Sequence, residues 1–194
     1  MAKRQAKTER KTRETDILVE MNLDGRGKYE IDTGVAFLDH MLTHVAKHGK
    51  TDLTVKARGD LDVDAHHTVE DVGICIGSCL AEALGDKRGI SRFGSSVLPM
   101  EDAKAEVAVD LSGRAFCVCD VKYHTEKIGD FDVECIEEFL RSFANAGKLN
   151  LHVSVPYGTN SHHITEAIFK ALGQSLALAV KIVGTDVPST KGSL

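Results

Sequence analysis

The chain of 194 residues lacks several patterns that would point directly to a chemistry. Its five cysteines include no Cys-x-x-Cys pair, and their odd number argues against both a disulfide framework and a zinc finger. No P-loop pattern occurs, so ATP chemistry is not expected. We therefore expect a cytoplasmic protein whose cysteines are small core residues.

Positive charge is also in short supply. A net charge of −5 disfavours general binding to nucleic acid or to a membrane, since either would need a basic surface. Residues 1–13 are basic, but no apolar stretch follows them, so they predict neither a signal peptide nor a spanning helix. We expect them to form a solvated N-terminal arm. The remaining composition is typical of one or two compact soluble domains.

The chain does contain a repeated histidine motif. His-His-x-x-Glu occurs at residues 66–70 and again at 162–166. Positions four apart share a helix face, so the first histidine and the glutamate of each copy can direct two ligand atoms at one ion. The second histidine diverges by about 100°, so each doublet suits two metals better than one. Histidines satisfied by helix capping are the alternative, but the recurrence favours a two-metal site.

The motif belongs to a longer internal duplication. Leu23–Arg26 corresponds to Leu111–Arg114 at an offset of 88 residues, and Asp52–Val55 corresponds to Asn150–Val153 at an offset of 98. The offset falls to 96 at the second doublet, because two residues are lost in a loop, where such changes are best tolerated.

Hydrophobic patterning indicates the same order of elements in both halves. Alternating residues predict strands over 17–23 and 103–111, and helical spacing predicts one helix from near Val35 and another ended by Gly85. We expect an α+β fold of two similar strand-helix-strand-helix halves that pack in layers as one catalytic unit. The predicted half-domains span residues 14–94 and 95–194.

A histidine stripe on the first predicted helix adds candidate ligands. His40, His44 and His48 recur at a spacing of four, although a lone histidine there is more often structural. Asp39 precedes His40 and could orient its imidazole. At the offset of 98, Glu138 corresponds to His40, and a carboxylate in place of an imidazole exchanges one ligand type for another.

A basic, glycine-punctuated loop, Gly85–Gly94, joins the halves. Its arginine and serine donors suit a phosphate monoester, although a linker also attracts such residues for turns and solubility. Further phosphate candidates are Arg114, Lys170 and the C-terminal cluster Pro188–Gly192.

Together these motifs resemble the imidazoleglycerol-phosphate dehydratase family. The resemblance runs nearly end to end and rests on Arg13–Thr15, Phe37–Met41, Asp64–Asp71, Gly89–Gly94, Asp110–Arg114, Ser161–Glu166 and Ser189–Gly192. It implies a hydro-lyase of histidine biosynthesis that converts imidazole glycerol phosphate to imidazole acetol phosphate, with two Mn(II) ions per site. It also implies halves like domain 2 of ribosomal protein S5, and no fused phosphatase domain.

The resemblance also implies roles for individual residues. Metal ligands fall on His40, His66, His67, Glu70, His162, His163 and Glu166, and Glu138 stands where many relatives have a histidine. The catalytic residues would be Glu14, His66, Glu70, His162 and Glu166, with Glu14 as the acid-base carboxylate. Substrate and phosphate contacts fall on His44, His48, Arg92, Arg114, Lys170, Ser189 and Lys191. Relatives assemble as twenty-four-subunit shells with sites at subunit interfaces, so a homo-oligomer is implied.

Two other interpretations fit the same residues. A di-metal hydrolase of a phosphorylated or amide substrate would also use two metals and a carboxylate base, in that case to activate water. A metal-storage or metal-stabilised shell protein would use the histidines without needing Glu14 or Arg92.

Overall fold

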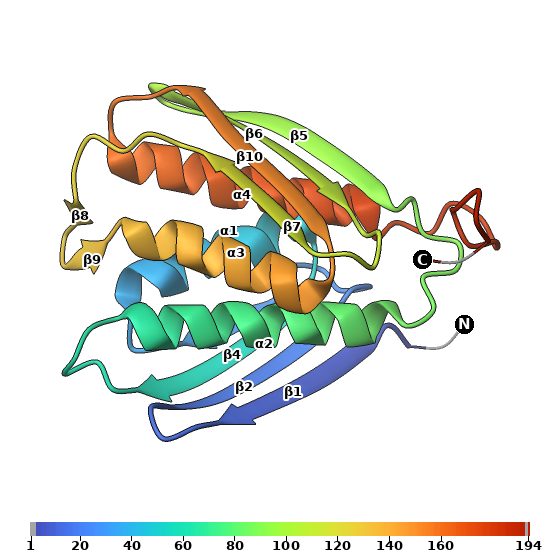
Figure 1. Cartoon of the computed structure of the whole chain (residues 1–194), viewed down its shortest axis with the longest axis horizontal. Coiled ribbons are helices and arrows are strands. Elements are labelled where there is room, and N and C mark those ends of the chain that lie inside the picture. Colours follow the sequence, from blue (N-terminus) through green and yellow to red (C-terminus); the bar gives the residue numbers. More distant parts are fainter. Residues whose placement is uncertain (1–2, 193) are drawn as a thin grey trace.

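In the computed structural model, residues 3–192 and 194 are described, and within them four helices lie between two four-stranded sheets (Figure 1). The first sheet contains, in order, β1 (Gln5–Lys11), β2 (Thr15–Asn22), β4 (Asp52–Gly59) and β3 (Tyr29–Asp32). The second contains β5 (Phe93–Met100), β6 (Ala103–Asp110), β10 (Asn150–Tyr157) and β7 (Phe116–Asp120). The helices are α1 (Ala36–Gly49), α2 (His66–Leu84), α3 (Glu134–Gly147) and α4 (Ser161–Ala179). A short hairpin of β8 (Lys127–Ile128) and β9 (Phe131–Asp132) precedes α3.

Strand pairing confirms the α+β fold and its duplication. Val19 of β2 pairs with Val55 of β4, and their repeat counterparts, Val107 and Val153, pair in the second sheet. Both pairings are antiparallel. In each sheet a further strand pairs in parallel with the second strand of this central pair: β3 with β4, and β7 with β10. The two halves therefore share one topology, and the repeat offsets read from the sequence match residues of equal structural position.

The halves meet through their helices, at two equivalent glycines. A Cβ built on Gly77 of α2 would lie 2.4 Å from the carbonyl oxygen of Phe143 in α3. A Cβ on Gly173 of α4 would lie 2.8 Å from the carbonyl oxygen of Val45 in α1. Only glycine lets backbones approach this closely. The second helix of each half therefore crosses the first helix of the other half, which brings candidate ligand residues from both halves together.

The core lies between the sheets, as the alternating strand pattern predicts. Ile17 and Val19 of β2 are fully buried against the helices, while intervening residues face outward. Phe139 of α3 and Phe169 of α4 are also fully buried, with ring centroids 5.4 Å apart. Burial of each such side chain contributes about 1.5–3 kcal/mol. No helix of the described residues is both long enough and apolar enough to cross a membrane.

The N-terminal segment corrects one expectation. Residues 5–11 were expected within a solvated arm, but they form β1 and pair with β2 along their whole length. Ala6 packs against the core, while Lys7 and Lys11 point outward. An edge strand needs only backbone pairing and tolerates charged side chains, so its basic composition concealed it.

Two further details were not anticipated. The short strand β3 has no buried residue and therefore lacks a hydrophobic alternation. The strand β5 begins at Phe93, so residues 93 and 94, assigned to the first half-domain, lie in the second sheet.

Candidate metal and substrate site

The histidine doublets stand at the N-terminal ends of α2 and α4, which lie at the same end of the molecule (Figure 1). The side chain of Asn160 caps α4 by accepting hydrogen bonds from the backbone amides of His162 and His163, at 2.9 and 3.3 Å. The Asp64 carboxylate accepts a similar bond from the amide of His66 at 2.8 Å. Because capping uses the backbone amides, the imidazole rings stay available for other partners.

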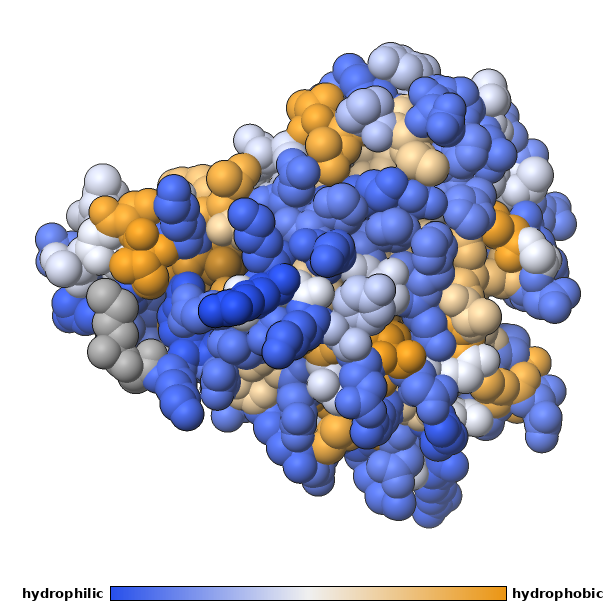
Figure 2. Space-filling model, turned by 180° about the vertical axis from the view of Figure 1, so that it is seen from behind, coloured by the Kyte–Doolittle hydropathy of each residue, from blue (hydrophilic) through white to orange (hydrophobic). Residues whose placement is uncertain are grey.

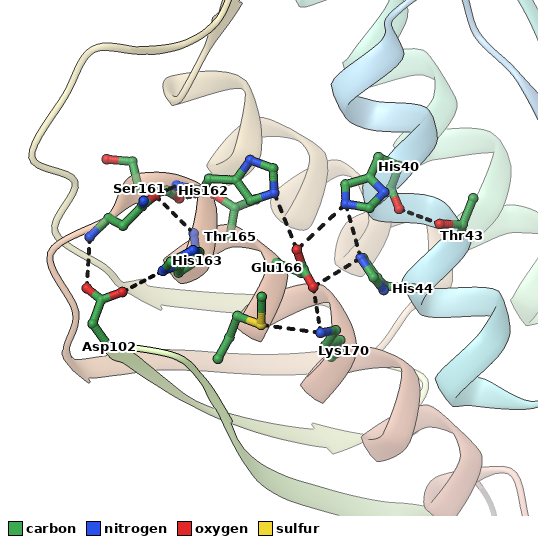
Figure 3. A network of polar contacts seen from close by, with 12 residues as sticks. His40, Thr43, His44, Asp102, Ser161, His162, His163, Thr165, Glu166 and Lys170 are labelled. Atoms are coloured by element: carbon green, nitrogen blue, oxygen red, sulfur yellow. Dashed lines mark hydrogen bonds and ion pairs between the residues drawn. The ribbon is translucent and has the colours of Figure 1, made fainter.

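Side chains from α1 and α4 converge on the carboxylate of Glu166, which is 7% exposed (Figure 3). Nζ of Lys170 lies 2.5 Å from it, and Nε2 of His162, His44 and His40 lie 3.3, 3.5 and 3.6 Å from it. Ligand atoms of His40, His162 and Glu166 all lie within 4.8 Å of one another. Two imidazole nitrogens and a carboxylate oxygen at this spacing fit a divalent ion such as Mn(II).

The protonation of this group suits a cation. Burial acts to raise the pKa of Glu166, but the hydrogen bond and charge of Lys170 lead the opposing effects, and the pKa is lowered. Burial is also the main cause that lowers the pKa of His44 to about 4, and it lowers the pKa of His48 together with the charge of Lys170. At neutral pH the Glu166 carboxylate is therefore ionised, the state in which a carboxylate binds a metal, and the neighbouring His44 and His48 are neutral.

The second histidine of each doublet faces a carboxylate that the sequence did not indicate. Oδ2 of Asp60 lies 3.0 Å from Nδ1 of His67, and this hydrogen bond raises the pKa of His67. Oδ1 of Asp102 lies 2.6 Å from Nδ1 of His163. The exposed carboxylate of Glu14 lies 4.0 Å from the same His67 nitrogen. Asp102 lies in the turn between β5 and β6, 61 residues before His163, so no local spacing could reveal it. Asp60 directly follows β4 and lies only seven residues before His67, but the sequence analysis did not single it out.

One expected contact is wrong, and another stays a prediction. Oδ1 of Asp39 accepts hydrogen bonds from the amide and hydroxyl of Thr33, at 3.0 and 2.6 Å, so it fixes the start of α1 instead of orienting His40. In the duplication, Glu138 on α3 corresponds to His40 on α1. Because α3 packs against α2 as α1 packs against α4, Glu138 is expected to face the first histidine doublet. Within the described residues, however, no hydrogen bond or ion pair joins Glu138 or Glu70 to a histidine.

The predicted phosphate residues divide into two groups. Lys170 lies beside Glu166, with His44 and His48 nearby. Arg92 lies elsewhere: its guanidinium contacts Asp110 at 2.7 and 3.1 Å, and its amide donates to the carbonyl oxygen of Ala179.

The remaining three candidates accompany Arg92. Nη1 of Arg92 donates to the carbonyl oxygen of Pro188, next to Ser189 and Lys191. The carbonyl oxygen of Arg92 accepts from the amide of Leu111, three residues before Arg114. Ala179 ends α4 thirteen residues beyond Glu166, about 20 Å along the helix. One chain therefore carries the two groups of predicted substrate residues at well separated positions.

Apolar side chains gather, among hydrophilic ones, at the end of the molecule where α2 and α4 terminate (Figure 2). Leu178, Val183 and Phe93 belong to this part of the chain, and they are 47%, 65% and 57% exposed. Exposed apolar side chains that gather on one face commonly mark a surface that contacts another protein.

Comparisons with known proteins point to one family. The family profile described as Imidazoleglycerol-phosphate dehydratase matches residues 33–176. A curated relative of that name from Desulforudis audaxviator is 56% identical over 190 residues, 97% of each chain. One from Thermoanaerobacter pseudethanolicus is 53% identical over 193 residues, 98% of this chain and all of the relative. The Staphylococcus aureus enzyme structure superposes with a TM-score of 0.84 at 36% identity, covering 92% of this chain and 99% of the other. The Pyrococcus furiosus structure, a complex with (S)-C348, gives 0.85 at 38%, covering 96% and 100%.

Proposed function

The chain belongs to the imidazoleglycerol-phosphate dehydratase family, a family of hydro-lyases in histidine biosynthesis, and we propose that it performs this dehydration with metal ions held around Glu166. The observation that carries the proposal is the convergence of His40, His162 and Glu166, because these residues come from both halves of the duplication and meet at a buried, ionised carboxylate. A storage protein would not need Lys170 at hydrogen-bonding distance from that carboxylate.

The reaction explains why a paired site is needed. The proton to be removed lies on a carbon without an adjacent carbonyl group, so negative charge must spread into the imidazole ring of the substrate. A pair of bound Mn(II) ions would supply the Lewis acidity that this spreading of charge requires. His40, His162 and Glu166 would hold one ion, and their repeat counterparts Glu138, His66 and Glu70 would contribute to the other.

Glu14 is the residue that we assign to proton transfer. It lies in the turn between β1 and β2, its side chain is 55% exposed, and it approaches His67 without forming a hydrogen bond to it. A carboxylate that is free to move between substrate atoms can both remove and return a proton.

We further propose that neighbouring copies complete each site. The Arg92 group lies about 20 Å from Glu166 along α4, too far to contact the same small substrate within one chain. The exposed apolar side chains near the Arg92 group support a contact with another copy there. A closed homo-oligomer, such as a twenty-four-subunit shell, would bring the two groups together across interfaces.

The test is an assay of the full chain, stripped of metal and then supplied with Mn(II) and imidazole glycerol phosphate. We expect the ketone product to form only after Mn(II) is returned. Glu166→Gln should abolish product formation, whereas Glu137→Gln, at an exposed residue paired with Arg141, should not. Release of inorganic phosphate without ketone would instead indicate a hydrolase, and Mn(II) binding without turnover would indicate a storage protein.

A further inference from the structure

The second histidine of each doublet is held through the same ring nitrogen. Nδ1 of His67 lies 3.0 Å from Asp60, and Nδ1 of His163 lies 2.6 Å from Asp102. A carboxylate beside Nδ1 favours the tautomer with the proton on that nitrogen. The lone pair of Nε2 is then available to a cation, and the ring orientation is fixed.

Asp102 is itself firmly placed. Its Oδ2 accepts hydrogen bonds from the amide and the hydroxyl of Thr159, both at 2.6 Å, and from the amide of Asn160 at 3.0 Å. Asn160 in turn caps α4, the helix that carries His163. Figure 3 shows Asp102 bridging toward this imidazole beside the start of α4. The carboxylate therefore ties the turn between β5 and β6 to both the helix start and the ring.

The two aspartates are not equivalent in the duplication. The offset of 88 residues, which relates β2 to β6, places Glu14 at the position of Asp102. The offset of 98, which relates β4 to β10, places Gly158 at the position of Asp60. In the second half, the turn between β5 and β6 supplies Asp102 to His163. In the first half, the equivalent turn carries Glu14, and Asp60, in the loop after β4, contacts His67 instead.

We propose that Asp60 and Asp102 are positioning residues that hold His67 and His163 with Nε2 available to the metal, and that Asp60 thereby leaves Glu14 free for proton transfer. This inference rests on the proposed function, in which Glu14 moves the proton, and on the ligand roles that the family resemblance implies for His67 and His163. The distances carry it: Asp60 approaches Nδ1 of His67 at 3.0 Å, whereas Glu14 stays 4.0 Å from the same atom.

The substitution Asp102→Asn provides a sharp test of the tautomer of His163. The oxygen of the new side chain would keep the bonds from the Thr159 and Asn160 amides, which turns the amide NH₂ toward His163. Nδ1 must then accept, so the ring proton moves to Nε2, the nitrogen that the metal requires. We expect Asp102→Asn to weaken Mn(II) binding to the metal-free full chain by about 10–100-fold. Asp86→Asn, at an exposed residue beside Arg88, is the matched control and should bind as the unmodified chain does.

Asp60 is tested through its relation to Glu14. In the unmodified chain, Glu14→Ala should leave Mn(II) affinity within about twofold, because Asp60 holds the ring. In the Asp60→Ala background Glu14 can close its 4.0 Å gap to Nδ1. There, Glu14→Ala should cost a further tenfold or so in affinity.

Three results would overturn the inference: unchanged Mn(II) affinity in Asp102→Asn, equal effects of Glu14→Ala in both backgrounds, or ¹⁵N spectra of the metal-free chain that place the proton of His67 and His163 on Nε2. The spectra need no variant, so they decide the matter even if a substitution prevents folding. Turnover by a Glu14 variant would instead contradict the proposed function, while Mn(II) affinity would still report on Asp60 and Asp102.

Discussion

Thr15 Oγ1 donates a 2.5 Å hydrogen bond to Oδ2 of the buried Asp71, which joins the turn that carries Glu14 to the helix that carries Glu70. Nε of Arg10, on β1, contacts the other carboxylate oxygen of Asp71 at 2.8 Å. The N-terminal strand therefore helps to place the proposed acid-base residue next to the proposed ligands, a role that a solvated arm could not have.

The second half has alanines at the equivalent positions, Ala103 and Ala167, both buried. Thr15→Ala alone should cost about 1–3 kcal/mol of stability, because it leaves a buried carboxylate oxygen without a partner. The double variant Thr15→Ala/Asp71→Ala recreates the apolar pair of the second half. We expect it to be about 1–2 kcal/mol more stable than the sum of the single effects predicts. Urea unfolding at pH 7 measures this, and simple additivity would contradict it.

Glu14→Gln tests proton transfer separately from metal binding. The amide keeps the size of the side chain but cannot take up a proton near neutral pH, so turnover should fall by a factor of about 10² to 10⁴. Metal content and assembly should match those of the unmodified chain. Among the described residues the Glu14 carboxylate accepts no hydrogen bond, and it lies 4.0 Å from Nδ1 of His67. Elemental analysis and size measurement provide the control, and loss of either would count against this role.

Gly77→Ala tests the crossing of α2 and α3. Alanine normally favours a helix over glycine by about 1 kcal/mol. Here the new Cβ would meet the backbone of Phe143 at 2.4 Å and Gly147 at 2.7 Å, so the helices must separate. We expect a net loss of about 1–3 kcal/mol in unfolding free energy. Gly184→Ala has no atom within 4 Å of the new Cβ and should change stability by less than about 0.5 kcal/mol. Equal stability of the two variants would refute the close crossing.

Mixed assemblies test whether neighbouring copies share a site. Glu166→Gln disables the metal group, and Arg114→Ala removes an exposed cation from the group around Arg92. Each variant alone should be inactive or nearly so. Co-assembly at equal amounts should restore activity to about a quarter of the sites, because those take an intact group from each copy. No recovery in verified mixed assemblies would place both groups in the same chain.

Buried thiols should react slowly in the folded protein. Burial raises the pKa of Cys75 to about 12 and that of Cys79 to about 11, and both side chains are fully buried. Alkylation requires the thiolate, so iodoacetamide at pH 8 should modify these cysteines far more slowly in the folded chain than in urea. Mass spectrometry of digested protein measures the difference, and rapid native modification of Cys75 would contradict the predicted core position.

Much of the site was predictable because its signals are local. Spacing along the chain sets which residues share a helix face, so His162 and Glu166 could be paired from the sequence. In the structure, Nε2 of His162 lies 3.3 Å from Oε2 of Glu166. The repeat offsets also identified equivalent residues without coordinates. The expectation for Asp39 failed because adjacency in sequence does not set direction: its carboxylate turns back to Thr33 to close the start of α1.

The sequence by itself determined the duplication, the helix and strand periods and the two histidine doublets, because these depend on spacing along one chain. Only the tertiary structure decided that His40 joins His162, that Asp60 and Asp102 hold the second histidines, and that the Arg92 group lies apart from Glu166. Those relations depend on how α1 crosses α4 and on where loops end. Close packing at Gly173 sets the crossing of α1 and α4, and no local sequence pattern encodes it.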